Sequence, residues 1–130
     1  MTENAIMAAA GFAGTTVIKY ASANYMVQEL CFFLKQCGVE IDGIGTTTLT
    51  ITGVDDIDQT LDYTLSEDPT DSMFFLAAAA ATNSSITIKR CPIEFLELEL
   101  LVLEKMGLKY KKSDVYVSNN EQTKLVDITT

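Results

Sequence analysis

The chain contains two copies of one pattern, and this internal repeat constrains its fold more than any single residue does. The first copy runs from the alanines at 8–10 through the β-branched stretch TVIK at 16–19 to Gly38. The second copy runs from the alanines at 77–79 through ITIK at 86–89 to Gly107, so the two glycines are 69 residues apart. Repeated supersecondary units of this length bury their apolar faces against one another or against further copies.

Apolar spacing and turn residues predict the order helix–strand–helix–strand–strand in each copy, with one additional leading strand before the second. Thr2 is expected to cap the first helix, and Asp68 or Ser66 to cap the first helix of the second copy. In the first copy we expect helices at 5–13 and 24–37 and strands at 15–20, 39–42 and 46–52. In the second copy we expect helices at 69–81 and 93–106 and strands at 61–65, 85–90, 108–110, 115–118 and 124–129.

These elements divide the chain into a first repeat unit at 1–53, a linker at 54–60 and a second repeat unit at 61–130. The first unit lacks the leading strand that the second one has. The linker is acidic through Asp55, Asp56 and Asp58, and we interpret it as a solvated segment. A calcium loop would need a longer ligand pattern with a closing Glu.

The helices of both copies are unusually apolar. Residues 77–81 are five consecutive alanines, and residues 93–106 are apolar on most helical faces. Helices of this kind are usually buried, and small residues let helix axes approach closely. The sequence therefore predicts an α+β fold in which sheets enclose a layer of helices.

Composition excludes several classes of function. Eighteen acidic against nine basic residues give a formal charge of −9, which opposes binding to nucleic acid. No apolar run reaches the roughly 18 residues of a membrane span. The chain has no histidine, so zinc sites and Ser-His or Cys-His catalysis are not expected, and we predict no metal.

The three cysteines are an odd number without a CxxC motif, which favours free thiols in a reducing compartment and a cytoplasmic location. Cys31 and Cys37 stand at helical spacing among apolar residues, as core residues do. Cys91 lies beside Lys89 and Arg90, so a reactive thiol is the alternative to core packing there.

Four stretches of the sequence resemble segments of one enzyme family, in order along the chain. The stretch TENAIMAA at 2–9 with GTTVI at 14–18 resembles the third repeat of these enzymes. Asp68 with FLAAA at 75–79, and CPIEFLE at 91–97, resemble the fourth repeat. VDITT at 126–130 resembles the strand before the family's catalytic Pro-Thr-Asp segment. The family is that of the UDP-N-acetylglucosamine 1-carboxyvinyltransferases, which are enolpyruvyl transferases.

The resemblance implies a piece of a larger enzyme, with two βαβαββ units of the enolpyruvyl-transferase inside-out α/β barrel type, one from each side of the interdomain hinge. Such enzymes transfer enolpyruvyl from phosphoenolpyruvate to UDP-N-acetylglucosamine in peptidoglycan synthesis and need no metal or organic cofactor. The family's catalytic cysteine loop, Lys-Asn pair and phosphate-binding arginines are absent here, and Arg90 is the chain's only arginine. The resemblance therefore implies no catalytic residue in this chain and no activity of the chain alone.

The substrate-lobe or hinge candidates are Thr2, Glu3, Asn4 and Asp68. In the family the residues just before Thr2 touch the nucleotide sugar, whereas a capping role is the simpler interpretation of residues 2–4. For Asp68 an N-cap and a hinge or substrate role remain open. The stretch PTD at 69–71 mimics the catalytic segment, but its place before the alanine-rich helix matches the hinge segment.

Two departures from the family pattern leave room for alternatives. ANYM at 23–26 replaces Arg-Glu-Pro-Glu, and Pro69 stands where an arginine follows the hinge aspartate. A non-catalytic paralogue, or an interaction module that forms a homodimer through exposed repeat edges, is the alternative. The shikimate-pathway enolpyruvyl transferase and RNA 3′-phosphate cyclase share the fold, but their basic phosphate sites and nucleotide-linked histidine, respectively, are missing.

Overall fold

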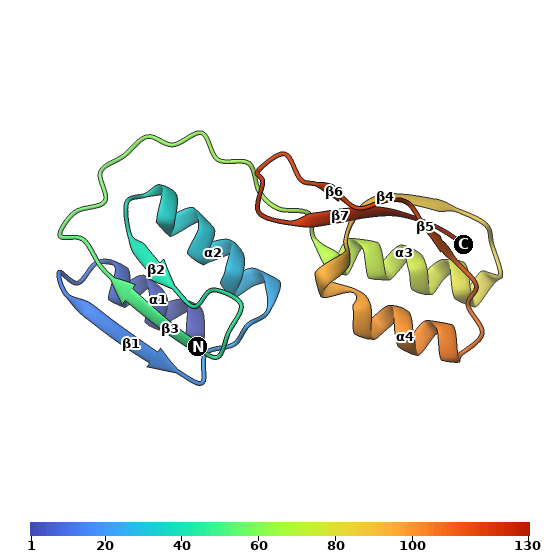
Figure 1. Ribbon diagram of the computed structural model, residues 1–130, viewed down its shortest axis with the longest axis horizontal. Coiled ribbons are helices and arrows are strands. Elements are labelled where there is room, and N and C mark those ends of the chain that lie inside the picture. The colour runs from blue at the N-terminus through green and yellow to red at the C-terminus, as the bar shows by residue number, and fades with distance from the viewer. The chain divides into compact units, whose positions relative to one another are not determined.

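β-branched and alanine-rich segments alternate along the chain, and in the computed structural model of residues 1–130 they form four α-helices and two antiparallel sheets (Figure 1). This mixture is compatible with the predicted α+β class. The chain divides into two units, Met1–Tyr63 and Thr64–Thr130. The division at 1–53, 54–60 and 61–130 stays a prediction.

The first unit is a three-stranded antiparallel sheet with two helices packed on it. Its elements are α1 (Thr2–Ala10), β1 (Thr15–Lys19), α2 (Tyr25–Gln36), β2 (Glu40–Asp42) and β3 (Thr48–Thr52). The strand order is β1-β3-β2, with Ile41 opposite Ile51. Leu49 and Ile51 alternate with polar residues along β3, so their side chains lie on the buried face with Ile6, Val27 and Cys31.

The second unit has a four-stranded antiparallel sheet built around its last strand. Its elements are α3 (Pro69–Thr82), β4 (Thr87–Pro92), a 3-10 turn (Ile93–Phe95), α4 (Glu97–Lys105), β5 (Lys111–Lys112), β6 (Tyr116–Val117) and β7 (Lys124–Thr129). β7 pairs with β4, β5 and β6. Leu76 of α3 and Leu100 of α4 are buried with Cys91, Val126 and Ile128.

The predicted first helix is wrong by three residues at each end, because α1 begins at Thr2 and ends at Ala10. Thr2 is not its cap, since its hydroxyl accepts a hydrogen bond from the Ser22 N–H (3.1 Å). At the other end the Ala10 carbonyl accepts a hydrogen bond from the Val54 N–H (2.9 Å). The chain leaving β3 therefore takes the place of the next helical turn.

The strand predicted at 61–65 does not form, and neither copy has a leading strand. Tyr63 instead lies against α2, where its ring meets the edge of Phe33 at 5.3 Å between centroids. Its hydroxyl donates a hydrogen bond to Glu29 (2.9 Å). The Gln59 amide donates to the Cys37 carbonyl (3.4 Å), so residues 59–63, which follow the acidic stretch, are attached to α2 and to the residue after it.

Other boundaries in the second unit also differ from the prediction. The helix expected at 93–106 is divided into the 3-10 turn and α4, because Leu96 has φ −119° and ψ −4° and donates its N–H to the Ile93 carbonyl (3.0 Å). The strand expected at 85–90 begins two residues later and contains a bulge between Ile88 and Cys91. The strand expected at 108–110 is displaced to Lys111–Lys112.

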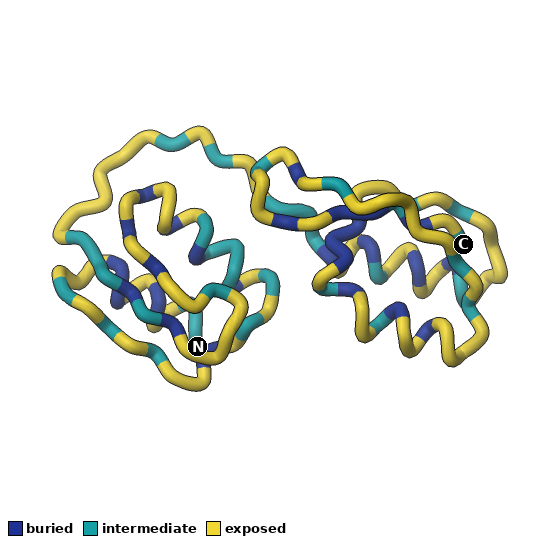
Figure 2. The backbone as a smooth tube through the Cα atoms, in the orientation of Figure 1, coloured by how far each residue is buried: buried dark blue, intermediate teal, exposed yellow.

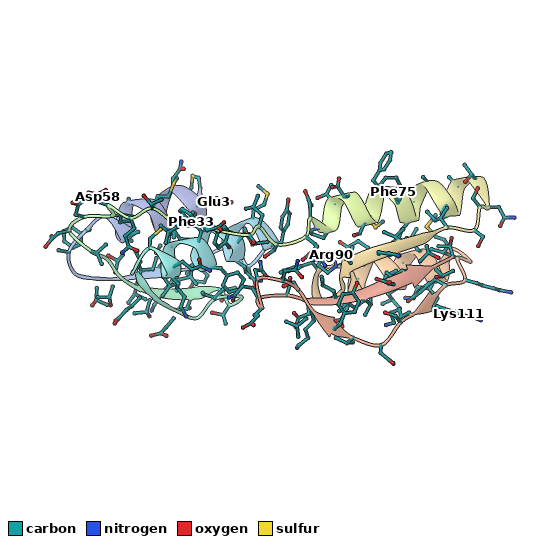
Figure 3. The ribbon with its side chains drawn as sticks, turned by 90° about the horizontal axis from the view of Figure 1, so that it is seen from above. Glu3, Phe33, Asp58, Phe75, Arg90 and Lys111 are labelled. Atoms are coloured by element: carbon teal, nitrogen blue, oxygen red, sulfur yellow. The ribbon has the colours of Figure 1, made fainter.

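The outer sides of the helices carry large apolar side chains. Figure 2 shows buried and exposed positions alternating along each helix. On α4 the exposed residues include Leu98, Leu101 and Val102, and Met106 directly follows the helix. On α3 the exposed Phe75 points away from the sheet (Figure 3).

Candidate functional site

Asp68 stands at the start of α3 and caps it. Its backbone is extended (φ −79°, ψ 116°), and its Oδ1 accepts a hydrogen bond from the Thr70 N–H (2.7 Å). Pro69 occupies the first helical position, where a missing N–H costs nothing. The interpretation of Asp68 as an N-cap is thus confirmed, and a hinge or substrate role stays a prediction.

Thr2, Glu3 and Asn4 form the first turn of α1 in the other unit. The carboxylate of Glu3 lies 3.3 Å from the N-terminal ammonium. A hydrogen bond from its own backbone N–H, followed by that ammonium, lowers the pKa of Glu3. Asn4 is exposed, whereas Thr2 and Glu3 are half-buried. This turn presents one carboxylate and one amide to solvent but no cation of its own beyond the chain terminus.

The Thr2–Ser22 hydrogen bond brings this turn beside the segment that departs from the family pattern. Asn24, two residues after Ser22, caps α2 by accepting the Val27 N–H (3.0 Å). The Gln28 side chain donates to the Ala23 carbonyl (2.8 Å). The segment 22–24 is therefore engaged in holding the start of α2, and its side chains are neutral.

A polar network in the second unit was not predicted from the sequence. Tyr116 donates a hydrogen bond to Asp127 Oδ1 (2.6 Å), and the Arg90 N–H donates to the same oxygen (3.0 Å). These two hydrogen bonds lower the pKa of Asp127, the Tyr116 contribution being the larger. Burial, and then the bond to Asp127, raises the pKa of Tyr116.

The guanidinium of Arg90 forms an ion pair with Glu67, the residue before Asp68. In Figure 3 Arg90 lies near the N-terminal end of α3. The sequence offered one signal for this contact, since Arg90 is the chain's only arginine. Nothing in the spacing of the residues indicated that Glu67 would be its partner.

The three cysteines are buried free thiols, which confirms core packing for Cys31 and Cys37. Burial raises the pKa of Cys31 to about 11 and also raises that of Cys91. Lys89 and Arg90 do not offset that burial at Cys91. Thiolates are the reactive form of cysteine, so neither Cys31 nor Cys91 is placed as a nucleophile.

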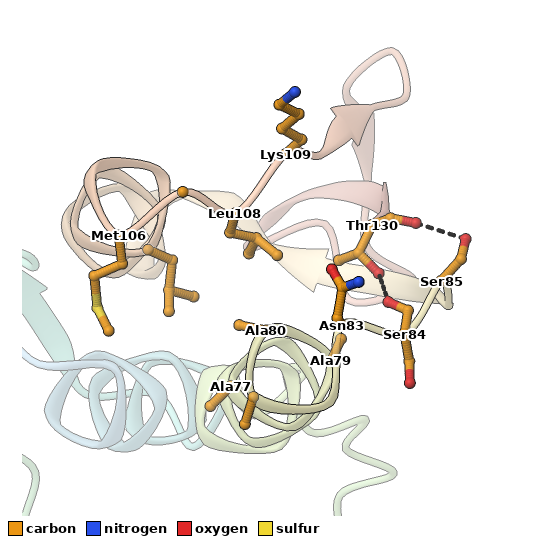
Figure 4. A pocket seen from close by; sticks show the side chains of 13 residues that line it. Ala77, Ala79, Ala80, Asn83, Ser84, Ser85, Met106, Leu108, Lys109 and Thr130 are labelled. Atoms are coloured by element: carbon orange, nitrogen blue, oxygen red, sulfur yellow. Dashed lines mark hydrogen bonds between the residues drawn. The ribbon is translucent and has the colours of Figure 1, made fainter.

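An open groove of about 750 Å³ lies in the second unit beside the alanine-rich face of α3. Ala77 and Ala80 line one side, and Met106 and Leu108 line the other (Figure 4). At its polar end Ser85 donates to the Thr130 carbonyl (2.7 Å), and Thr130 donates to the Ser84 carbonyl (3.0 Å). The groove is therefore apolar along its sides, and these polar groups at its end are hydrogen-bonded to one another.

The groove lacks what a phosphorylated ligand requires. Lys109 is its one cationic side chain, and it points away from α3 (Figure 4). Binding and turnover of phosphoenolpyruvate need several positioned cations.

No three carboxylate or thiol side chains of the chain come together to hold a metal ion. The longest helix, α3, has 14 residues, and no helix combines the length and hydrophobicity of a membrane span.

Comparison with known proteins shows similarity along the whole chain. Residues 1–130 match the family model described as EPSP synthase (3-phosphoshikimate 1-carboxyvinyltransferase). UDP-N-acetylglucosamine 1-carboxyvinyltransferase 2 of Prochlorococcus marinus is 35% identical over 99% of the chain. The UDP-N-acetylglucosamine 1-carboxyvinyltransferase of Thermodesulfovibrio yellowstonii is 30% identical over 99% of the chain. That of a Sulfurovum species is 37% identical over 84%. The matches cover 30%, 32% and 26% of these relatives, so the chain spans about a third of their length or less.

Proposed function

Because the chain belongs to the EPSP synthase family along all of its 130 residues, we propose that it forms part of a UDP-N-acetylglucosamine 1-carboxyvinyltransferase. Such an enzyme would transfer enolpyruvyl from phosphoenolpyruvate to UDP-N-acetylglucosamine for peptidoglycan synthesis, in the cytoplasm. The observation that carries the proposal is the identity of 30–35% over 99% of the chain to enzymes of that name.

We also propose that the two units are βαβαββ repeats without their leading strand, whose helices are enclosed by sheets when further repeats are present. The support is the apolar outer side of the helices, where Leu98 and Met106 are 68% and 77% exposed. An apolar helix face is stable when another layer covers it. Helix α3 adds alanines that allow close approach of a second helix.

The chain alone is proposed to be inactive. Its three thiols are buried, and burial raises the pKa of Cys31 and of Cys91. Its only arginine is paired with Glu67. The reaction requires cations around the phosphate and carboxylate of phosphoenolpyruvate. Arg90 is the one arginine that could contribute, and it lies in a contact within its own unit.

The proposal is tested by an amide NMR titration of the chain with UDP-N-acetylglucosamine, with UDP-glucose as the matched control ligand. Shifts clustered at residues 2–4 and 68–71 with the first ligand support a surviving substrate-facing lobe. A folded spectrum without shifts removes the ligand-binding role from this part of the protein. Phosphate release from phosphoenolpyruvate by the chain alone would contradict the proposed inactivity.

The alternative is a non-catalytic module of the same fold that associates through its exposed apolar helices. The exposed side chains of Phe74, Leu98 and Met106 favour it. Sedimentation equilibrium separates the two proposals. A concentration-dependent dimer that a Leu98→Glu substitution dissociates supports the module, and a monomer at millimolar concentration argues against it.

A further inference from the structure

Residues 64–67 overlap the end of the strand that was expected at 61–65, and side chains hold them instead. The amide nitrogen of Asn120 donates hydrogen bonds to the Thr64 carbonyl (3.3 Å) and to the Ser66 hydroxyl (2.8 Å). Glu67, the last residue of the segment, pairs with the Arg90 guanidinium and accepts a hydrogen bond from Thr123 (3.4 Å). Contacts from two separate parts of the second unit thus reach one short segment.

Asn120 is itself fixed in a tight turn between β6 and β7. Its side-chain oxygen accepts hydrogen bonds from the Ser118 hydroxyl and from the Gln122 N–H (3.1 Å). The Ser118 oxygen in turn accepts the Thr123 N–H (3.2 Å), and both Ser118 and Thr123 are only 4% exposed. With the oxygen of its amide occupied, the NH₂ group of Asn120 is directed at the segment, and both of its hydrogens are used.

Arg90 is directed at the segment by the bulge in β4. Its φ of +61° is the left-handed conformation, which an arginine seldom adopts. Its N–H is held by Asp127 Oδ1 (3.0 Å) and the Tyr116 hydroxyl (3.1 Å), so the conformation is supported from β6 and β7. A bulge redirects a side chain out of strand alternation, and here it faces Glu67.

The ion pair is better protected than an ordinary surface pair. The side chain of Glu67 is 17% exposed, and it has a second partner in Thr123. Exposed ion pairs contribute little because solvent screens them and both side chains lose freedom. The Arg90 side chain is 43% exposed, so the protection comes from the Glu67 side of the pair.

We propose that Asn120 and Arg90 form a side-chain clamp that takes the place of strand pairing and holds residues 64–67 as a rigid part of the second unit. Because Asp68 follows directly, the clamp also fixes the first turn of α3. Asn120 and Arg90 are therefore positioning residues. The clamp itself is independent of the proposed function, and only its relevance to ligand binding through Asp68 rests on that proposal.

The clamp is tested by ¹⁵N relaxation of the amides of residues 65–67 in the full 130-residue chain. We expect order parameters of about 0.85 in the wild type, as in rigid backbone, and below about 0.6 in Asn120→Ala and in Arg90→Gln. Glu121→Gln, in the same turn, and Lys89→Gln, beside Arg90, are matched controls that should keep the wild-type value.

The proposal is overturned if residues 65–67 are already below about 0.6 in the wild type, or if either variant keeps the wild-type value. Ser66→Ala removes one acceptor from the segment side without touching the sheet, and it should lower the order parameters even if Arg90→Gln fails to fold. Unchanged amide shifts in β7 identify variants that remain folded. Order parameters that support the clamp, together with no amide shifts on addition of UDP-N-acetylglucosamine, would uphold this inference and contradict only the ligand-binding role.

Discussion

Replacing Leu76 by alanine should open the second unit while leaving the first unit closed. Leu76 is fully buried in α3, in the same apolar cluster as Cys91. A buried Leu→Ala substitution costs about 2–5 kcal/mol, and we take about 3. A unit the size of Thr64–Thr130 has a free energy of unfolding of roughly 3–10 kcal/mol. The substitution therefore removes a third or more of the stability of the second unit.

The assay is thiol modification followed by mass spectrometry of the labelled peptides. A loss of about 3 kcal/mol raises the open population about 100-fold. When reclosing is faster than labelling, the labelling rate follows that population. Cys91 is buried in the second unit and Cys31 in the first. We expect the rate at Cys91 to rise about 100-fold and the rate at Cys31 to stay unchanged.

Leu98→Ala is the matched control, because it makes the same chemical change at a position of the second unit that is 68% exposed. Its cost should lie within about 0.5 kcal/mol, so neither thiol should react faster. Equal acceleration of Cys31 and Cys91 by Leu76→Ala would mean that both units open together, and it would refute the prediction. No acceleration at either thiol would refute the burial of Leu76.

Three further outcomes follow from single contacts. Asp68→Ala removes the cap of α3 and should lower the unfolding free energy of the second unit by about 1 kcal/mol in urea, whereas equal stability would contradict the cap. Tyr63→Phe keeps the ring but loses the bond to Glu29, and should cost the first unit about 1–2 kcal/mol. Tyr20→Phe, at an exposed ring, should cost nothing measurable. Asp127 has a lowered pKa, so its stabilisation is present above the ordinary carboxyl pKa of about 4 and is lost as the pH falls through its folded value. Between pH 5 and pH 2 the urea midpoint of unfolding should therefore fall less steeply for Asp127→Asn than for the wild type. Parallel curves for the two proteins would refute the stabilising role of the Asp127 carboxylate.

The sequence predicted most elements because local pattern and final packing agree in them. Helix α2 has apolar residues at helical spacing, an Asn cap and a glycine after its end, and it forms one residue inside the predicted limits. Strand β7 occupies its predicted range of 124–129, where buried and exposed positions largely alternate. Asp68 caps α3 as one of the two predicted alternatives.

The errors arise where partners distant in the sequence decide the structure. The segment at 61–65 has strand-like composition, but Tyr63 contacts Glu29 and Thr64 contacts Asn120, and neither contact has a periodic signal. Helix α1 ends early because Val54 occupies the carbonyl of Ala10. Gly53 allows this approach, since a Cβ there would lie 2.2 Å from the Ala9 carbonyl oxygen.

For the candidate site, the sequence predicted that the cysteines Cys31 and Cys37 are core residues, and they are. It did not predict the contact of Arg90 with Glu67. Arg90 reaches Glu67 only because a bulge turns its backbone to φ +61°, and a bulge depends on the register of β4 against β7. Strand register is a property of paired strands, so no single segment encodes it.

Because the outer sides of α3 and α4 are apolar, the net charge of the chain decides whether its copies stay apart in solution or aggregate. At neutral pH the formal charge of −9 makes copies of the chain repel one another, although Phe75, Leu101 and Met106 are exposed. Near the sequence pI of about 4.3 this repulsion vanishes, and at high salt it is screened beyond a few ångströms. Purified samples should therefore be clearest in dilute salt well above pH 5 and turbid near the pI, with turbidity rising as the chain is concentrated.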